Sequence, residues 1–202
     1  MENKRIITPS LILTKRLFGD GHITFNALTR DIGLINAPAF GGQRLSKRFK
    51  GGLDHFQIVE IEIEEKINSG VASYNISSVK DVVKKFTQIT STMEKYTSAS
   101  YVLELTSTIL MPYEKAGKSG RTYFELAADC LQKIDSEKHS KEMITEVYNF
   151  TLELYRESGF LPNIEKLNGV KNMLEHLEEL NSKIIGTAPK SFALLYKTYA
   201  SL

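Results

Sequence analysis

The spacing of apolar residues changes near Val79, and this change restricts the fold more than any other feature of the sequence. From Ser10 to Ile76, apolar residues recur at a period near two, as in strands with one buried face. After Val79 they recur at the longer spacing of amphipathic helices, and this spacing continues to the last residues. The sequence therefore predicts an α+β protein, with a β domain over residues 1–78 and an all-α helical domain over residues 79–202.

Five short strands are expected in the first part of the chain. The Gly19-Asp20-Gly21 turn favours a tight antiparallel hairpin between the first two of them. Five strands in about 70 residues are typical of a closed OB-type barrel, although periodicity alone leaves an SH3-like barrel open. In the second strand, Ile23, Phe25 and Ala27 are expected on one face. The expected strands are Leu11–Lys15, His22–Thr29, Leu34–Phe40, Phe56–Glu64 and Val71–Ile76.

Positive charge is concentrated at the start of the chain. Residues 1–50 contain nine basic and three acidic side chains, a net charge of +6, while the whole chain carries only +2. Such segregation favours a polyanion-binding head on a mildly acidic body. One strand carries Glu60, Glu62 and Glu64 at alternate positions, and the face that they share would repel phosphate.

The basic loop Gly41–Gly52, which glycine pairs bracket, is the main candidate site. Its cations can contact successive phosphates of a nucleic acid while Phe49, or the neighbouring Phe40, stacks on a base. A solvated loop without a ligand is the competing interpretation. The candidate phosphate contacts are Lys15, Arg16, Arg30, Arg44, Lys47, Arg48 and Lys50. Three other phenylalanines are expected in the barrel core: Phe18, Phe25 and Phe56.

Several other classes are disfavoured. Cys130 is the only cysteine, which excludes an internal disulfide and a paired-cysteine zinc site, and no cofactor is predicted. The longest uncharged stretch, Ile67–Val79, has 13 residues, fewer than the roughly 20 of a membrane-spanning helix. No apolar leader segment follows Met1, so a cytoplasmic location is expected. Gly117-Lys118-Ser119 lacks the first glycine and the preceding strand of a P-loop, and no catalytic set can be assembled, so no enzyme is predicted.

A series of short motifs resembles the RecO family of recombination mediators over most of residues 5–165. The motifs are Leu13-Thr14-Lys15-Arg16 with Phe18-Gly19-Asp20-Gly21, Leu28-Thr29-Arg30-Asp31-Ile32-Gly33, Ala99–Leu105 and Phe150–Pro162. After the first two of these motifs come the basic loop and the strand that begins at Phe56, in the order expected for that family. Many members carry four zinc-binding cysteines beyond this region. Here Leu167 and Val170 stand where the first pair is expected, so no zinc module is predicted.

The resemblance implies a non-enzymatic DNA repair protein. RecO-like proteins bind single- and double-stranded DNA through the barrel, anneal complementary strands, and load the RecA recombinase together with RecR and the single-stranded DNA-binding protein. A basic turn with Lys115, Lys118 and Arg121 would receive the acidic tail of that last protein, and a solvated turn is the competing interpretation. An OB-fold RNA-binding protein and a protein-only adaptor stay open as alternative functions.

Overall fold

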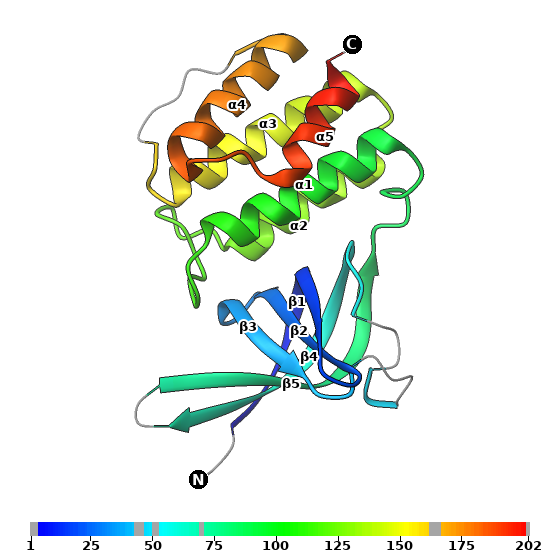
Figure 1. Ribbon diagram of the computed structural model, residues 1–202, viewed down its shortest axis with the longest axis vertical. Coiled ribbons are helices and arrows are strands. Elements are labelled where there is room, and N and C mark those ends of the chain that lie inside the picture. The colour runs from blue at the N-terminus through cyan, green and yellow to red at the C-terminus, as the bar shows by residue number, and fades with distance from the viewer. Residues whose placement is uncertain (1–3, 43–46, 50–52, 69–70, 162–166, 201–202) are drawn as a thin grey trace. The chain divides into compact units, whose positions relative to one another are not determined.

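The computed structural model describes residues 4–42, 47–49, 53–68, 71–161 and 167–200 (Figure 1). The first part of the chain forms a five-stranded antiparallel sheet, and the short 3-10 helix η1 (Lys47–Phe49) follows the third strand. The strands are β1 (Lys4–Phe18), β2 (His22–Thr29), β3 (Gly33–Ala39), β4 (Gln57–Asn68) and β5 (Val71–Lys85).

The strand order β3-β2-β1-β4-β5 closes this sheet into a barrel. The long strand β1 pairs with β4 from Lys4 to Leu11 and with β2 from Ser10 to Phe18. It therefore joins the strands β2 and β3 on one side to β4 and β5 on the other. The outermost strands of that order, β3 and β5, also approach each other. This arrangement, with helices after the barrel, confirms the predicted α+β fold with an OB-type barrel.

Alternating residues of the strands fill the barrel core. Ile23, Phe25 and Ala27 lie on one face of β2, and all three are buried. Ile61 and Ile63 of β4 pack in the same core. The period-two pattern therefore correctly identified the inner face of the sheet.

Three strands are longer than the sequence pattern predicted: β4 ends at Asn68 and not at Glu64, and β1 and β5 differ most. β1 begins at Lys4 and β5 continues to Lys85, whereas alternation indicated strands over residues 11–15 and 71–76. Both extensions pair with β4, as in the pairs Lys4 with Glu65 and Lys85 with Gln57. The backbone hydrogen bonds of a neighbouring strand extend these segments, and apolar periodicity does not report such bonds.

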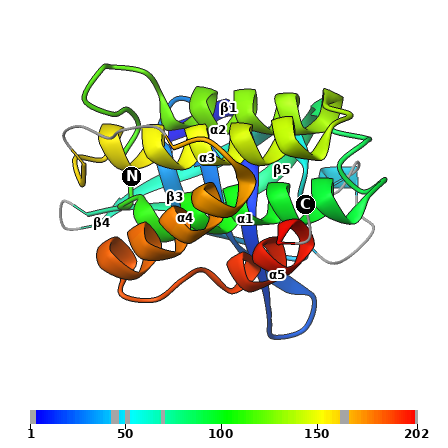
Figure 2. The ribbon, with the colours of Figure 1, turned by 90° about the horizontal axis from the view of Figure 1, so that it is seen from above.

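The second part of the chain forms a helical bundle. Its helices are α1 (Met93–Ile109), α2 (Tyr123–Ser136), α3 (Ser140–Glu157), α4 (Val170–Ile185) and α5 (Lys190–Tyr199). In the bundle, α5 packs on α1 and α4 packs on α3 (Figure 2). Thr122 precedes α2 and forms a capping box, in which its hydroxyl accepts from the N–H of Glu125 while the Glu125 carboxylate accepts from the N–H of Thr122.

Tyrosines and one asparagine form a polar network inside this bundle. Asn181 is fully buried, and its Oδ1 accepts hydrogen bonds from the hydroxyls of Tyr101 and Tyr155. Burial raises the pKa of Tyr101 to about 12 and also raises that of Tyr155, so both hydroxyls stay protonated and donate. The network joins α1, α3 and α4.

The chain divides into two compact units. The barrel unit contains residues up to Lys85 together with Met111–Lys115, and the helical unit contains Phe86–Leu110 and the chain from Ala116 onward. Among the described residues, no group of three or more His, Cys, Asp or Glu side chains is placed to hold a metal ion. None of the helices described is long and apolar enough to cross a membrane.

Candidate nucleic-acid interface

The strands β1, β2 and β3 are neighbours in the sheet (Figure 1). Side chains that alternate with the buried ones form their outer face. Register pairs Phe18 with His22 and, two residues along each strand, Arg16 with Thr24. Phe40 follows directly after β3, whose last residue, Ala39, pairs with Ile23. Alternation therefore brings Phe18, His22 and Phe40 side by side at one end of the three strands, with Arg16 about 7 Å along the same face.

Three rings make contact at this end of the sheet. The ring centroids of Phe18 and His22 are 5.4 Å apart, those of His22 and Phe40 are 5.5 Å apart, and those of Phe18 and Phe40 are 6.2 Å apart. Phe18 is 39% exposed and Phe40 is 49% exposed, and His22 is half-buried. We call these three residues the ring cluster.

Two hydrogen bonds connect the ring cluster to the start of the basic loop. The N–H of Gly41 donates to Nδ1 of His22 over 2.9 Å, so the His22 proton of a neutral ring lies on Nε2. Gly41 has φ +73°, a left-handed conformation that glycine adopts without strain. Nη2 of Arg48 donates to the carbonyl of Phe40 over 3.2 Å. These contacts hold Arg48 beside the rings.

The predicted phosphate contacts do not all lie on this face. Arg16 and Arg48 are exposed, and neither has an acidic partner among the residues that the structure describes. Lys15 pairs with Asp54 over 3.0 Å, and alternation directs it away from the face of Arg16. Arg30 directly follows Thr29, the last residue of β2, and lies roughly 26 Å from His22 by strand length.

The rest of the basic loop is described only in part. Arg44 and Lys50 lie outside the described residues, and so does the side chain of Lys47, whose backbone begins η1. Phe49, expected to stack on a base, is 6% exposed and packs in the barrel core with Leu53. Its ring is therefore not accessible to a base. The guanidinium of Arg48 lies 5.6 Å from the centre of the Phe49 ring.

Two residues of the ring cluster were not identified as site residues from the sequence. Phe18 was expected in the core with Phe25 and Phe56; Phe25 is buried and Phe56 is half-buried, but Phe18 faces outward. His22 had no predicted role. The Gly19-Asp20-Gly21 turn contained the necessary signal, because a tight hairpin at this point pairs Phe18 directly with His22.

No protein-family model matches the chain. A curated protein from Caldanaerobacter subterraneus subsp. tengcongensis, named DNA repair protein RecO, is 26% identical over 183 residues, which are 91% of this chain and 69% of that protein. The chain is similar to RecO. This comparison supports the family resemblance that the sequence motifs indicated, and the similarity extends over both units.

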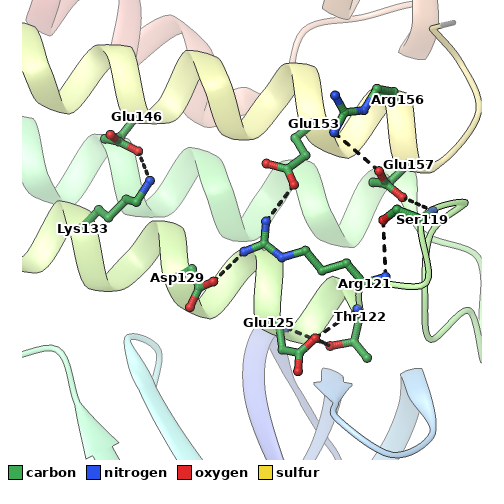
Figure 3. Close-up of polar contacts among 10 residues, drawn as sticks. All are labelled: Ser119, Arg121, Thr122, Glu125, Asp129, Lys133, Glu146, Glu153, Arg156 and Glu157. Atoms are coloured by element: carbon green, nitrogen blue, oxygen red, sulfur yellow. Dashed lines mark hydrogen bonds and ion pairs between the residues drawn. The ribbon is translucent and has the colours of Figure 1, made fainter.

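The RecO resemblance also suggested a partner site at Lys115, Lys118 and Arg121, and the structure distributes these residues differently. Lys115 belongs to the barrel unit, whereas Lys118 and Arg121 belong to the helical unit. Lys118 is exposed. The Arg121 guanidinium binds the carboxylates of Asp129 and Glu153, the second over 2.7 Å (Figure 3). The charge of Arg121 is therefore neutralised within the helical unit.

The Gly117-Lys118-Ser119 loop contacts a carboxylate of the protein itself. Oε2 of Glu157, at the end of α3, accepts from the N–H of Ser119 over 2.7 Å (Figure 3). The Glu157 carbonyl accepts from the N–H of Lys118 over 3.2 Å. A Cβ at Gly117 would lie 2.4 Å from Cβ of Glu157, so glycine permits this approach. The N–H of Ser119 therefore binds a carboxylate of the protein itself. The sequence of this loop lacks the P-loop signature of a site for a nucleotide phosphate.

The Glu157 contact predicts a specific pH dependence of stability. The N–H of Ser119 holds the pKa of Glu157 below its ordinary 4.5, so this stabilisation is complete above that pH and is lost as pH falls through the lowered pKa. Between pH 7 and pH 3, we expect wild type to lose more unfolding free energy than Glu157→Gln, as measured by urea denaturation. Glu179→Gln, an exposed change on α4, serves as the control and should follow wild type. Parallel curves for wild type and Glu157→Gln would contradict this role.

Proposed function

We propose that this protein is a DNA repair and recombination mediator that binds single- and double-stranded DNA through its OB-type barrel. The observation that carries the proposal is the outer face of β1–β3, where the cations Arg16 and Arg48 lie beside exposed rings without acidic partners among the described residues. The similarity to a protein named DNA repair protein RecO supports the biological process.

In this proposal the barrel unit contacts the phosphate backbone. Arg16 and Arg48 replace condensed counterions, and Arg44, Lys47 and Lys50 extend the contact along the basic loop. Cations held between two anionic strands reduce their mutual repulsion, which is the physical requirement for annealing. Lys15 and Arg30 are secondary contacts, because each has an acidic neighbour.

The finer parts of the proposed function follow from the RecO resemblance. The protein would anneal complementary strands and help to load recombinase with RecR and the single-stranded DNA-binding protein, in the cytoplasm and without catalysing a reaction. Lys115 and Lys118 are proposed contacts for the acidic tail of the latter protein. Arg121 contributes less, because two carboxylates already bind it. The barrel and helical units would act as separate domains in these steps.

The salt dependence of DNA binding tests the proposed function. The variant Arg16→Gln/Arg48→Gln removes two phosphate contacts, so the slope of log affinity against log salt for a single-stranded oligonucleotide should become shallower by about 1.4. Fluorescence anisotropy at several salt concentrations measures this slope. Lys183→Gln/Lys197→Gln, which removes the same charge from exposed positions of the helical unit, should retain the wild-type slope.

The same titration separates the alternative functions. Wild type that binds no oligonucleotide even at low salt would disprove the DNA assignment and favour a protein-only adaptor. Tighter binding to RNA than to DNA of equal length and sequence would favour an RNA-binding protein, because the 2′-hydroxyl distinguishes the two.

A further inference from the structure

The ring cluster exposes aromatic faces at the surface of the barrel. The planes of Phe18 and Phe40 are inclined by 74° and those of His22 and Phe40 by 76°, so both pairs make edge contacts. In an edge contact the edge of one ring covers one face of the other, so the remaining faces are not covered by the neighbouring ring. Phe18 and Phe40 remain 39% and 49% exposed, which makes their faces accessible to a ligand.

The charges around the ring cluster favour a ligand with both an aromatic and an anionic part. Arg16 lies on the same face two residues before Phe18, and Arg48 bonds to the backbone of Phe40. Asp20, in the turn beyond Phe18, is exposed and would repel phosphate there. A bound strand of nucleic acid would therefore extend from the rings toward Arg16 and Arg48 and away from the hairpin turn.

We infer that the ring cluster is a stacking site for an unpaired nucleobase of single-stranded DNA. This inference rests on the proposed function and adds a preference to it. In a duplex, each base is covered on both faces by its neighbours, so the rings contact only a strand whose bases are unstacked. The barrel binds both forms through its cations and holds the single strand more tightly through the rings. Stacking is tolerant of sequence, because every base has a π-face.

His22 positions this site. Its Nδ1 accepts the N–H of Gly41, which joins the β1–β2 hairpin to the residues after β3. Phe18 and Phe40 come from these two segments, so the imidazole keeps their rings at one end of the sheet while also contacting both.

A double substitution tests the stacking site. Phe18→Leu/Phe40→Leu retains apolar side chains at exposed positions, so the fold should be preserved, but it removes both benzene rings. We expect affinity for a single-stranded oligonucleotide to fall roughly 10-fold, and affinity for a blunt duplex of the same sequence to change less than about twofold. Phe160→Leu, the same change at an exposed phenylalanine of the helical unit, is the matched control.

An oligonucleotide with abasic sites gives a second, independent measurement. It keeps the phosphates but lacks several bases, so wild type should bind it more weakly than the intact strand, whereas Phe18→Leu/Phe40→Leu should bind both about equally. Equal losses on single strand and duplex, or no loss on either, would overturn the stacking site while leaving cation-dependent DNA binding intact. If wild type binds neither the single strand nor the duplex, the proposed function itself is wrong. A change from dimer to monomer in the variant, with unchanged DNA affinity, would assign the rings to a contact between copies of this chain.

Discussion

Replacing Asn181 by alanine is expected to lower the free energy of unfolding by about 3 to 5 kcal/mol. Oδ1 of Asn181 accepts from the hydroxyls of Tyr101 and Tyr155 over 3.2 and 2.6 Å inside the helical unit. Alanine leaves two buried donors without this acceptor and opens a cavity at a fully buried position. Urea denaturation followed by helical circular dichroism measures the loss.

Two further variants isolate the hydrogen bonds in this effect. Asn172→Ala makes the same change at an exposed position of α4, and we expect a change within about 0.5 kcal/mol. Combined with Asn181→Ala, the double change Tyr101→Phe/Tyr155→Phe should be less destabilising than it is in wild type, because the hydroxyls that it removes no longer have this partner. Additive losses would show that the network does not act as a unit.

Replacing Gly33 by alanine is expected to destabilise the barrel unit by about 3 kcal/mol or more. Gly33 has φ +90°, and a Cβ there would lie 2.4 Å from the backbone oxygen of Glu114. The segment that would have to move is fixed, because the N–H of Tyr113 donates to the carbonyl of Leu34 over 2.7 Å. Thermal unfolding, followed by a spectroscopic signal from the strands of the barrel unit, should therefore show a large decrease in Tm.

Gly186→Ala separates the backbone effect from the steric clash. Gly186 has φ +81°, and nothing lies within 4 Å of a Cβ built on it, so alanine there carries the left-handed penalty alone, about 1 kcal/mol. If Gly33→Ala is no more destabilising than Gly186→Ala, the close approach of Glu114 to Gly33 is not a constraint on the barrel.

Local pattern was sufficient for the general architecture. Alternation identified Ile23, Phe25 and Ala27 as inner-face residues, and the change of period indicated strands followed by helices, because each signal reflects burial of one face of a single element; the strands themselves continue past Val79. The same signal could not predict that β1 begins at Lys4 or that β5 continues to Lys85, since those segments are held by backbone pairing with β4.

The sequence by itself determined that the first 50 residues carry a net positive charge through their nine basic residues, because charge composition is a property of residues and not of their contacts. Only the tertiary structure decided which of them remain unpaired among the described residues. Lys15 forms an ion pair with Asp54, which is 39 positions away in the chain. Arg16, one residue later, has no acidic partner among the described residues. Phe49 is buried and Phe18 is exposed for the same reason: strand pairing and barrel closure bring distant segments together, and the resulting contacts decide which side chains are accessible.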